Sequence, residues 1–118
     1  MRFITSFLLV FSLSACSIIF PIPHDSDQFS LLVDTKIEVD KLDCSDKTPW
    51  EYVIQDVNKL AVYTQLREDP QAENISQLKD ALVKAKDSNN VTFCEGILKV
   101  QKTRVDTVVN AWRGRWVR

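Results

Sequence analysis

The sequence is poor in the residues that build most enzyme sites. Its 118 residues include one histidine, His24, and only two glycines. A Ser-His-Asp or Cys-His arrangement therefore lacks a base on a rigid scaffold, because His24 lies next to prolines in a segment with the composition of a linker. The two glycines form no phosphate-binding loop, and so few of them disfavour a turn-rich β fold.

Neighbouring carboxylates are the remaining candidates for acid-base chemistry. They occur as Asp40 with Asp43 and as Glu68 with Asp69, and charged residues of this kind usually belong to a solvated surface. Two distant cysteines and one histidine do not have the spacing of zinc ligands. We therefore expect no catalytic residues, no metal and no cofactor, and the chain is predicted not to be an enzyme.

The N-terminus has the features of an export signal. Arg2 precedes an apolar run at residues 3–13, which has the length of a signal-peptide core and is shorter than the roughly 20 residues that span a bilayer. The sequence LSAC at 13–16 resembles the lipobox of bacterial lipoproteins. That resemblance implies cleavage between Ala15 and Cys16, a diacylglycerol thioether on Cys16 and acylation of the new amino group.

A lipidated Cys16 would hold the mature chain on a membrane, because two or more acyl chains anchor a protein stably. Residue 17 is Ser17 and not aspartate, which in lipoproteins of enteric type implies sorting to the outer membrane. The expected location is therefore the inner leaflet of the outer membrane, facing the periplasm. The alternative is an uncleaved anchor helix, since residues 18–20 extend the apolar run towards spanning length.

The two other cysteines form an even pair in an oxidising compartment. Removal of residues 1–15 from the 118-residue chain leaves 103 residues, enough for one small domain. A bridge between Cys44 and Cys94 would close a loop of about fifty residues and stabilise the fold by about 4 kcal/mol. The alternative is intermolecular bonding of these cysteines in a covalent homodimer.

Hydrophobic periodicity predicts a tether followed by helices. Residues 16–30 carry two prolines and small polar residues, so we expect an extended linker there and a folded domain at residues 31–118. Residues 31–43 fit either a strand or a helix. The helix is favoured, because a lone strand would have no partner in a chain that is otherwise helical.

Three further helices are predicted. Thr48 and Glu51 have the spacing of a capping box, which would start a helix whose apolar stripe runs to Asp69, itself able to cap the next helix. The last helix would open at Asn90 or Thr92. The predicted fold class is all-α, a small disulfide-stapled helical bundle or hairpin after a lipid-anchored flexible tether.

Charge is segregated along the mature chain. Residues 16–98 carry eight basic and fifteen acidic side chains, whereas residues 99–118 carry six basic and one acidic. The C-terminal end alternates tryptophan and arginine, which suits an anionic lipid interface or a protein interface. The predicted partner or membrane contacts are Trp112, Arg113, Arg115, Trp116 and Arg118. The alternative is that Trp112 completes the core and the arginines complement the helix dipole.

This architecture resembles that of an o-spanin, the outer-membrane lipoprotein subunit of a phage lysis complex, of the larger two-gene type carried by T-even-like phages. The resemblance rests on the lipobox at 13–16, Ser17, the tether, the small helical part and the basic C-terminus. It implies that an inner-membrane subunit joins the chain across the periplasm through residues 99–118. The complex would then disrupt the outer membrane through membrane fusion.

A rival class is an envelope lipoprotein that binds and blocks a receptor or a wall-degrading enzyme. The two classes differ in where the contact lies, because lysis uses the C-terminal segment and blocking uses the folded body. Nucleic acid is not an expected partner in either case, since a lipid-anchored envelope protein does not meet it.

Overall fold

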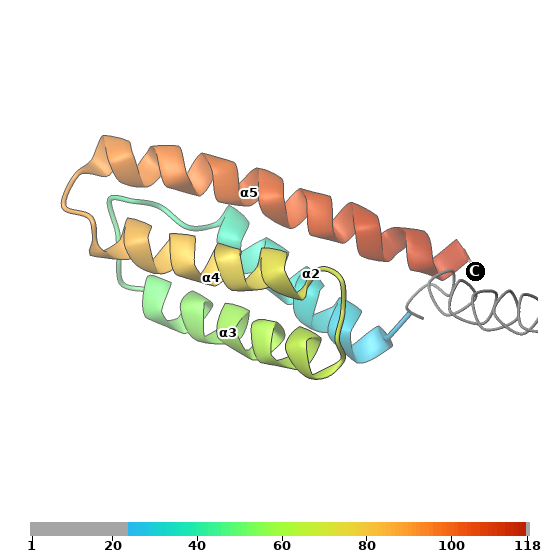
Figure 1. The fold of residues 1–118 in the computed structure, drawn as a ribbon. Coiled ribbons are helices and arrows are strands. Elements are labelled where there is room, and N and C mark those ends of the chain that lie inside the picture. The colour runs from blue at the N-terminus through green and yellow to red at the C-terminus, as the bar shows by residue number, and fades with distance from the viewer. Residues whose placement is uncertain (1–23, 118) are drawn as a thin grey trace, which may run out of the picture.

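The computed structural model describes residues 24–117. These residues form four α-helices, α2 (Ser26–Asp40), α3 (Trp50–Leu66), α4 (Ala72–Asp87) and α5 (Val91–Arg113), and a short 3-10 helix, η1 (Gly114–Val117), follows α5 (Figure 1). The predicted signal peptide, its cleavage site at Ala15, the lipidation site at Cys16 and the sorting residue Ser17 lie outside the described residues, as does Arg118.

The four helices run alternately in opposite directions along the bundle (Figure 1). Helix α2 packs against α3 and α5, and α4 packs against the same two helices, so the four surround a common core. The part of the chain that the structure describes contains no β-strand. The predicted all-α bundle is confirmed, and the ambiguous segment at 31–43 is helical as far as Asp40.

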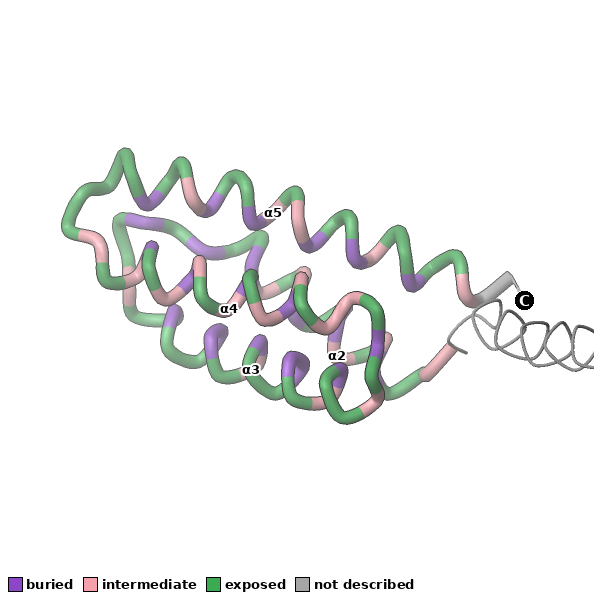
Figure 2. The backbone as a smooth tube through the Cα atoms, viewed as in Figure 1, coloured by how far each residue is buried: buried purple, intermediate pink, exposed green. Residues whose placement is uncertain are grey.

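Apolar stripes at three- and four-residue spacing supply the core. On all four helices the buried positions face the inside of the bundle (Figure 2). The buried side chains of α3 are Trp50, Val53, Ile54, Val57, Leu60, Ala61 and Thr64. Those of α5 are Cys94, Leu98, Gln101, Val105, Val108 and Trp112. Truncation of one of the large apolar side chains would lower the free energy of unfolding by about 2–5 kcal/mol.

A side-chain cap fixes the start of α5. The Asn90 side-chain oxygen accepts a hydrogen bond from the Phe93 N–H at 3.0 Å. This bond satisfies one of the backbone donors that a helix start leaves unpaired. The prediction of Asn90 as one of two starting points is confirmed, and Thr92 lies inside the helix.

Asp25 caps the first described helix in the same way. Its carboxylate accepts a hydrogen bond from the Gln28 N–H at 3.0 Å, and α2 therefore begins at Ser26. The predicted tether of residues 16–30 is wrong at its C-terminal end, because residues 26–30 are already helical. The sequence signal for this start was an aspartate immediately before an amphipathic stretch.

The predicted capping box at the start of α3 is absent. Helix α3 begins at Trp50 without a side-chain cap. The Thr48 N–H instead donates to the Asp46 carboxylate at 3.0 Å, which places Thr48 in the preceding loop. Glu51 forms an ion pair with Lys86 of α4. The prediction failed because Asp46 forms an Asx turn with the N–H two residues on, an alternative to helix capping.

A disulfide joins Cys44 to Cys94, whose Cα atoms lie 6.0 Å apart. Cys44 lies in the loop between α2 and α3, and Cys94 lies in the first turn of α5. Both residues are buried. The predicted internal bridge is therefore confirmed, and the structure assigns these cysteines to each other and not to a covalent homodimer.

Candidate functional site

The start of α2 and the end of α5 lie at the same end of the bundle (Figure 1). His24, Phe29, Trp112 and Arg115 line one small crevice there. We call this region, where α2 and α4 begin and α3 and α5 end, the terminal end. The opposite region, which contains the Cys44–Cys94 bond, is the disulfide end.

Trp112 is a core residue and not a surface contact. Its side chain is 1% exposed. It continues the buried stripe of Val105 and Val108, so the helix turns it inwards. The Arg115 guanidinium lies 5.7 Å from the centre of the Trp112 ring, within the range of a cation–π contact. Burial contradicts the predicted contact role of Trp112 and agrees with the alternative, in which it completes the core.

Arg115 is held by a buried carboxylate. Its Nη1 lies 2.6 Å from Asp69 Oδ2, and its Nη2 lies 3.1 Å from Asp69 Oδ1. The Asp69 side chain is fully enclosed, and that of Arg115 is 12% exposed. Two parallel bonds of this kind fix the guanidinium in one orientation. Arg115, predicted to contact a partner or a membrane, is therefore engaged inside the molecule.

Further hydrogen bonds extend this contact across the terminal end. Gln28 donates from Nε2 to Asp69 Oδ2 at 2.9 Å. Arg67 Nη1 lies 3.4 Å from Gln28 Oε1 and 3.2 Å from the Asp25 carboxylate. The Tyr63 hydroxyl donates to the same carboxylate at 3.0 Å. The network therefore connects the start of α2, the end of α3, the turn between α3 and α4, and η1.

The balance of contacts keeps Asp69 ionised. Burial alone would raise the pKa of Asp69, but hydrogen bonds from Arg115, from the Gln71 N–H and from Gln28 outweigh it and hold the pKa below its usual value. The expectation that Asp69 lies on a solvated surface is wrong, since the residue is 4% exposed. Its burial is tolerated because Arg115 supplies the opposite charge.

The rest of the predicted contact set is only partly described. Arg113 is exposed at the end of α5. The Trp116 side chain and Arg118 lie outside what the structure describes. Among the described side chains of the set, Arg113 is thus the one exposed cation, while Trp112 and Arg115 stabilise the bundle.

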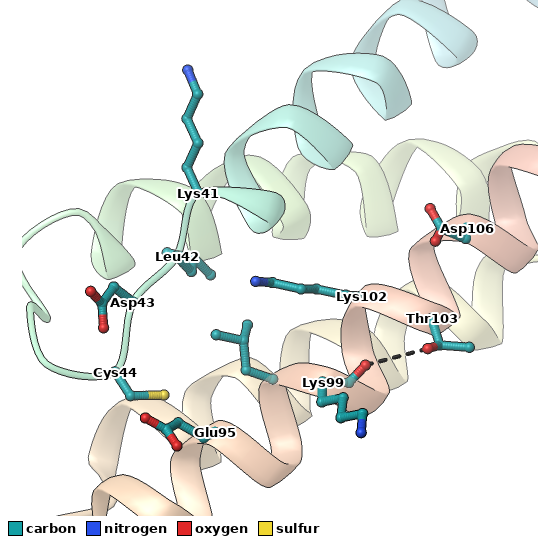
Figure 3. Close-up of a pocket in the computed structure, with 10 residues that line it drawn as sticks. Lys41, Leu42, Asp43, Cys44, Glu95, Lys99, Lys102, Thr103 and Asp106 are labelled. Atoms are coloured by element: carbon teal, nitrogen blue, oxygen red, sulfur yellow. Dashed lines mark hydrogen bonds between the residues drawn. The ribbon is translucent and has the colours of Figure 1, made fainter.

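A broad hollow of about 620 Å³ lies between the α2–α3 loop and α5. Its charged side chains do not converge (Figure 3). Lys41 points away from the hollow, Lys102 extends towards Leu42 and Asp43, and Lys99 points in another direction. This arrangement does not form a site for a single small anion.

Asp40 and Asp43, the first pair of neighbouring carboxylates noted in the sequence, each interact with another side chain. Asp40 forms an ion pair with Lys36 at 3.0 Å, and Asp43 accepts hydrogen bonds from Ser45. Within residues 24–117, no group of three or more His, Cys, Asp or Glu side chains is placed to hold a metal ion. Among the helices of the same range, none has the length and hydropathy needed to cross a membrane.

An apolar groove between α4 and α5 was not recognised from the sequence. Phe93, Gly96, Ile97 and Val100 of α5 line it, together with Ala81 of α4 and a few polar side chains. Phe93 is 47% and Val100 is 57% exposed. The signal that could have revealed the groove is a second apolar stripe on α5, beside the stripe that faces the core.

The fold defines the chain as a small all-α bundle with one internal disulfide. In comparisons with known proteins, no family model, no curated protein and no solved structure matches the chain. Its function is therefore inferred from its residues and their geometry.

Proposed function

We propose that this chain is a lipid-anchored envelope protein that acts by binding and not by catalysis, and that it is the outer-membrane subunit of a two-component phage spanin complex. In this function Cys16 carries the lipid, residues 17–23 connect it to the bundle, and the bundle lies in the periplasm. An inner-membrane subunit joins it there, and the complex disrupts the outer membrane through membrane fusion.

The position of the terminal end carries this proposal. Seven residues separate Cys16 from His24. Even a fully extended chain of that length spans no more than about 28 Å. Because His24 and Arg115 line the same crevice, the basic end of α5 stays within a similar reach of the lipid. A lipid on Cys16 would thus keep a cationic segment close to the membrane that holds it.

The spanin resemblance gives residues 99–118 two roles, binding the inner-membrane subunit and disrupting the outer membrane, and this geometry favours only the second. Proximity to the outer membrane suits a role in perturbing that membrane, where each exposed basic residue adds about 1 kcal/mol of attraction to an anionic surface. Arg113 is available for this role. A segment kept close to the outer membrane is correspondingly far from the inner membrane. The inner-membrane subunit would therefore contact the sides of the bundle or its disulfide end.

One observation favours a second candidate, an envelope lipoprotein that blocks a receptor or a wall-degrading enzyme. Trp112 and Arg115 are engaged inside the bundle. Two of the predicted C-terminal contacts are therefore not free to bind a partner. A blocking protein would bind its target through the sides of the folded bundle instead.

Co-expression tests the spanin function. The chain is produced with and without a candidate inner-membrane subunit in cells whose wall is being degraded, and rupture of the outer membrane is scored by microscopy. We expect rupture only when both chains are present. If cells that contain both chains, with this one lipidated, keep an intact outer membrane, the spanin function is wrong and the blocking function is favoured.

Cys16→Ser is the variant that tests the anchor. It removes the sulfur that would take the lipid and leaves Cys44 and Cys94 free to pair. Palmitate labelling and outer-membrane rupture should both be lost, while the circular dichroism of the purified bundle stays unchanged. Normal rupture by an unlabelled Cys16→Ser chain would contradict the anchored mechanism.

A further inference from the structure

Two neighbouring hollows lie along α4 and α5 and share one lining residue, Val100. The first, of about 570 Å³, lies near the start of α5 and is lined by Phe93, Gly96 and Val100. The second, of about 330 Å³, is lined by Val100, Arg104 and Thr107. Val100 lines both, so the two hollows adjoin at this residue, and together they follow α5 from Phe93 to Thr107 and are called the α4–α5 groove. This stretch of α5 is about 21 Å long, which matches about four turns of a second helix.

The groove is open and apolar in its first half. Phe93, Val100 and the neighbouring Val91 are 47%, 57% and 50% exposed. A Cβ added at Gly96 would meet no heavy atom within 4 Å, so nothing fills the space above this glycine. Apolar side chains at helical spacing beside an open glycine leave room for another helix to lie close to α5.

The charges that line the groove have one sign. Lys84 of α4 lies 5.8 Å from the Phe93 ring, and Arg104 of α5 forms a hydrogen bond with Gln77. Of the described residues that line either hollow, none is acidic. This contrasts with residues 16–98 as a whole, where fifteen acidic side chains outnumber eight basic ones. The groove is therefore complementary to an apolar surface with carboxylates at its edges.

We propose that the α4–α5 groove is the docking site for an amphipathic helix of a partner protein. Its apolar side chains would pack on Phe93, Gly96 and Val100, and its carboxylates would lie near Lys84 and Arg104. This assignment deepens the proposed function, on which its biological role rests, by giving the binding surface and the chemistry of the partner.

Two other occupants fit the groove less well. A second copy of this chain could dock through the same groove about a twofold axis. Its Lys84 and Arg104 would then face the same cations, and its groove lining would supply no carboxylate to pair with them. Residues 17–23 are joined to His24, which lies at the terminal end, whereas Phe93 and Gly96 belong to the first part of α5, towards the disulfide end.

Peptide binding to the full-length chain in lipid nanodiscs tests the proposal. The probe is a labelled synthetic helix of about 18 residues with a leucine stripe and flanking glutamates, and its matched control has lysines in place of the glutamates. Fluorescence anisotropy should show that the glutamate peptide binds at least about tenfold more tightly than the lysine peptide. Combining Lys84→Glu with Arg104→Glu should reverse this preference.

Gly96→Leu separates groove filling from misfolding. The added side chain enters open space, and loss of a helical glycine raises helix propensity, so the melting temperature should stay the same or rise. Binding of the glutamate peptide should fall at least about tenfold. Val100→Glu should have a similar effect, whereas Val62→Glu on α3, at a residue that is 45% exposed, should leave binding unchanged.

Several results would overturn the proposal. These are no saturable binding of the glutamate peptide, equal binding of the two peptides, or equal losses for Val62→Glu and Val100→Glu. A dimer in sedimentation that Val100→Glu dissociates would assign the groove to a second copy instead. Peptide binding does not require lysis, so failure of this test and failure of the rupture assay are distinguishable.

Discussion

The two ends of the bundle are held together by different chemistry. At the terminal end, a buried Asp69–Arg115 ion pair and Gln28 connect segments that are far apart in the sequence. At the disulfide end, a single covalent bond between Cys44 and Cys94 connects a loop to α5. The comparison shows that Arg115, in the C-terminal segment, stabilises the terminal end through a contact inside the molecule. Exposed apolar side chains are left on α5 towards the disulfide end.

The largest expected effect is at the disulfide end. Replacing Cys44 and Cys94 together by serine removes a cross-link that spans a sequence separation of 50 residues. The free energy of unfolding should fall by about 4 kcal/mol, because the unfolded chain regains the freedom of the open loop. Urea denaturation of the double variant measures this change. A loss below about 1 kcal/mol would show that packing, and not the bond, holds this end.

At the terminal end, Asp69→Ala leaves Arg115 and Gln28 without their buried partner. The free energy of unfolding should fall by about 3 kcal/mol, the cost of breaking a buried ion pair from one side. Arg113→Ala, an exposed arginine two residues from Arg115, is the matched control and should change stability by less than about 0.5 kcal/mol. Equal effects of the two substitutions would contradict a special role for the buried pair.

The Asp69–Arg115 contact also predicts how the stability of the protein falls at low pH. Because the pKa of Asp69 is lowered from 3.8, its contribution is complete above that value and is lost as the pH falls through the lower value of the folded state. In thermal unfolding, the melting temperature of wild type should therefore fall more steeply with decreasing pH than that of Asp69→Ala in the most acidic range. Parallel curves for the two proteins would be inconsistent with an ionised Asp69.

A smaller effect of opposite sign is expected on α2, between the two ends. Burial and the carboxyl groups of Asp56 and Asp34 raise the pKa of Glu38 from 4.5 to about 7. A raised acid pKa favours folding at low pH, so wild type should become more stable as the pH falls from about 7 to 4.5.

Glu38→Gln should remove this pH dependence and stabilise the protein at pH 8. Because Glu38 is partly exposed, solvent screening limits the gain to about 1 kcal/mol. Asp40→Asn, an exposed carboxylate on the same helix, is the control for loss of a surface charge. A wild-type pH profile in Glu38→Gln would contradict the raised pKa of Glu38.

Local sequence patterns predicted most of the fold. The core stripe of α5 and the Asn90 cap depend on residues three or four positions apart, and these spacings are properties of the helix itself. Setting Cys16 aside left Cys44 and Cys94 as an even pair, but the number of cysteines alone left bonding between two chains open, and the structure decides for the internal bond. The start of α3 was missed because two capping patterns compete there, and Asp46 forms a loop turn where Thr48 was expected to cap.

The terminal end and the groove show what local patterns do not contain. Asp69 and Arg115 are 46 residues apart, and no spacing in the sequence links them. Each was interpreted alone, as a surface carboxylate and a surface cation, whereas together they form a buried pair. The groove required a comparison between two helices, since only packing of α4 beside α5 reveals which side chains of α5 remain uncovered.

The position of the disulfide also determines how the molecule would carry tension. A pull between the N-terminal side of His24 and the C-terminus passes along residues 24–44, through the sulfur–sulfur bond, and on through residues 94–117. Helices α3 and α4 lie inside the closed covalent loop and bear none of that load along their backbones. Under force, α2 and α5 are therefore the two helices that carry the tension. Only the residues outside the closed loop, about half of residues 24–117, can be extended until a covalent bond breaks.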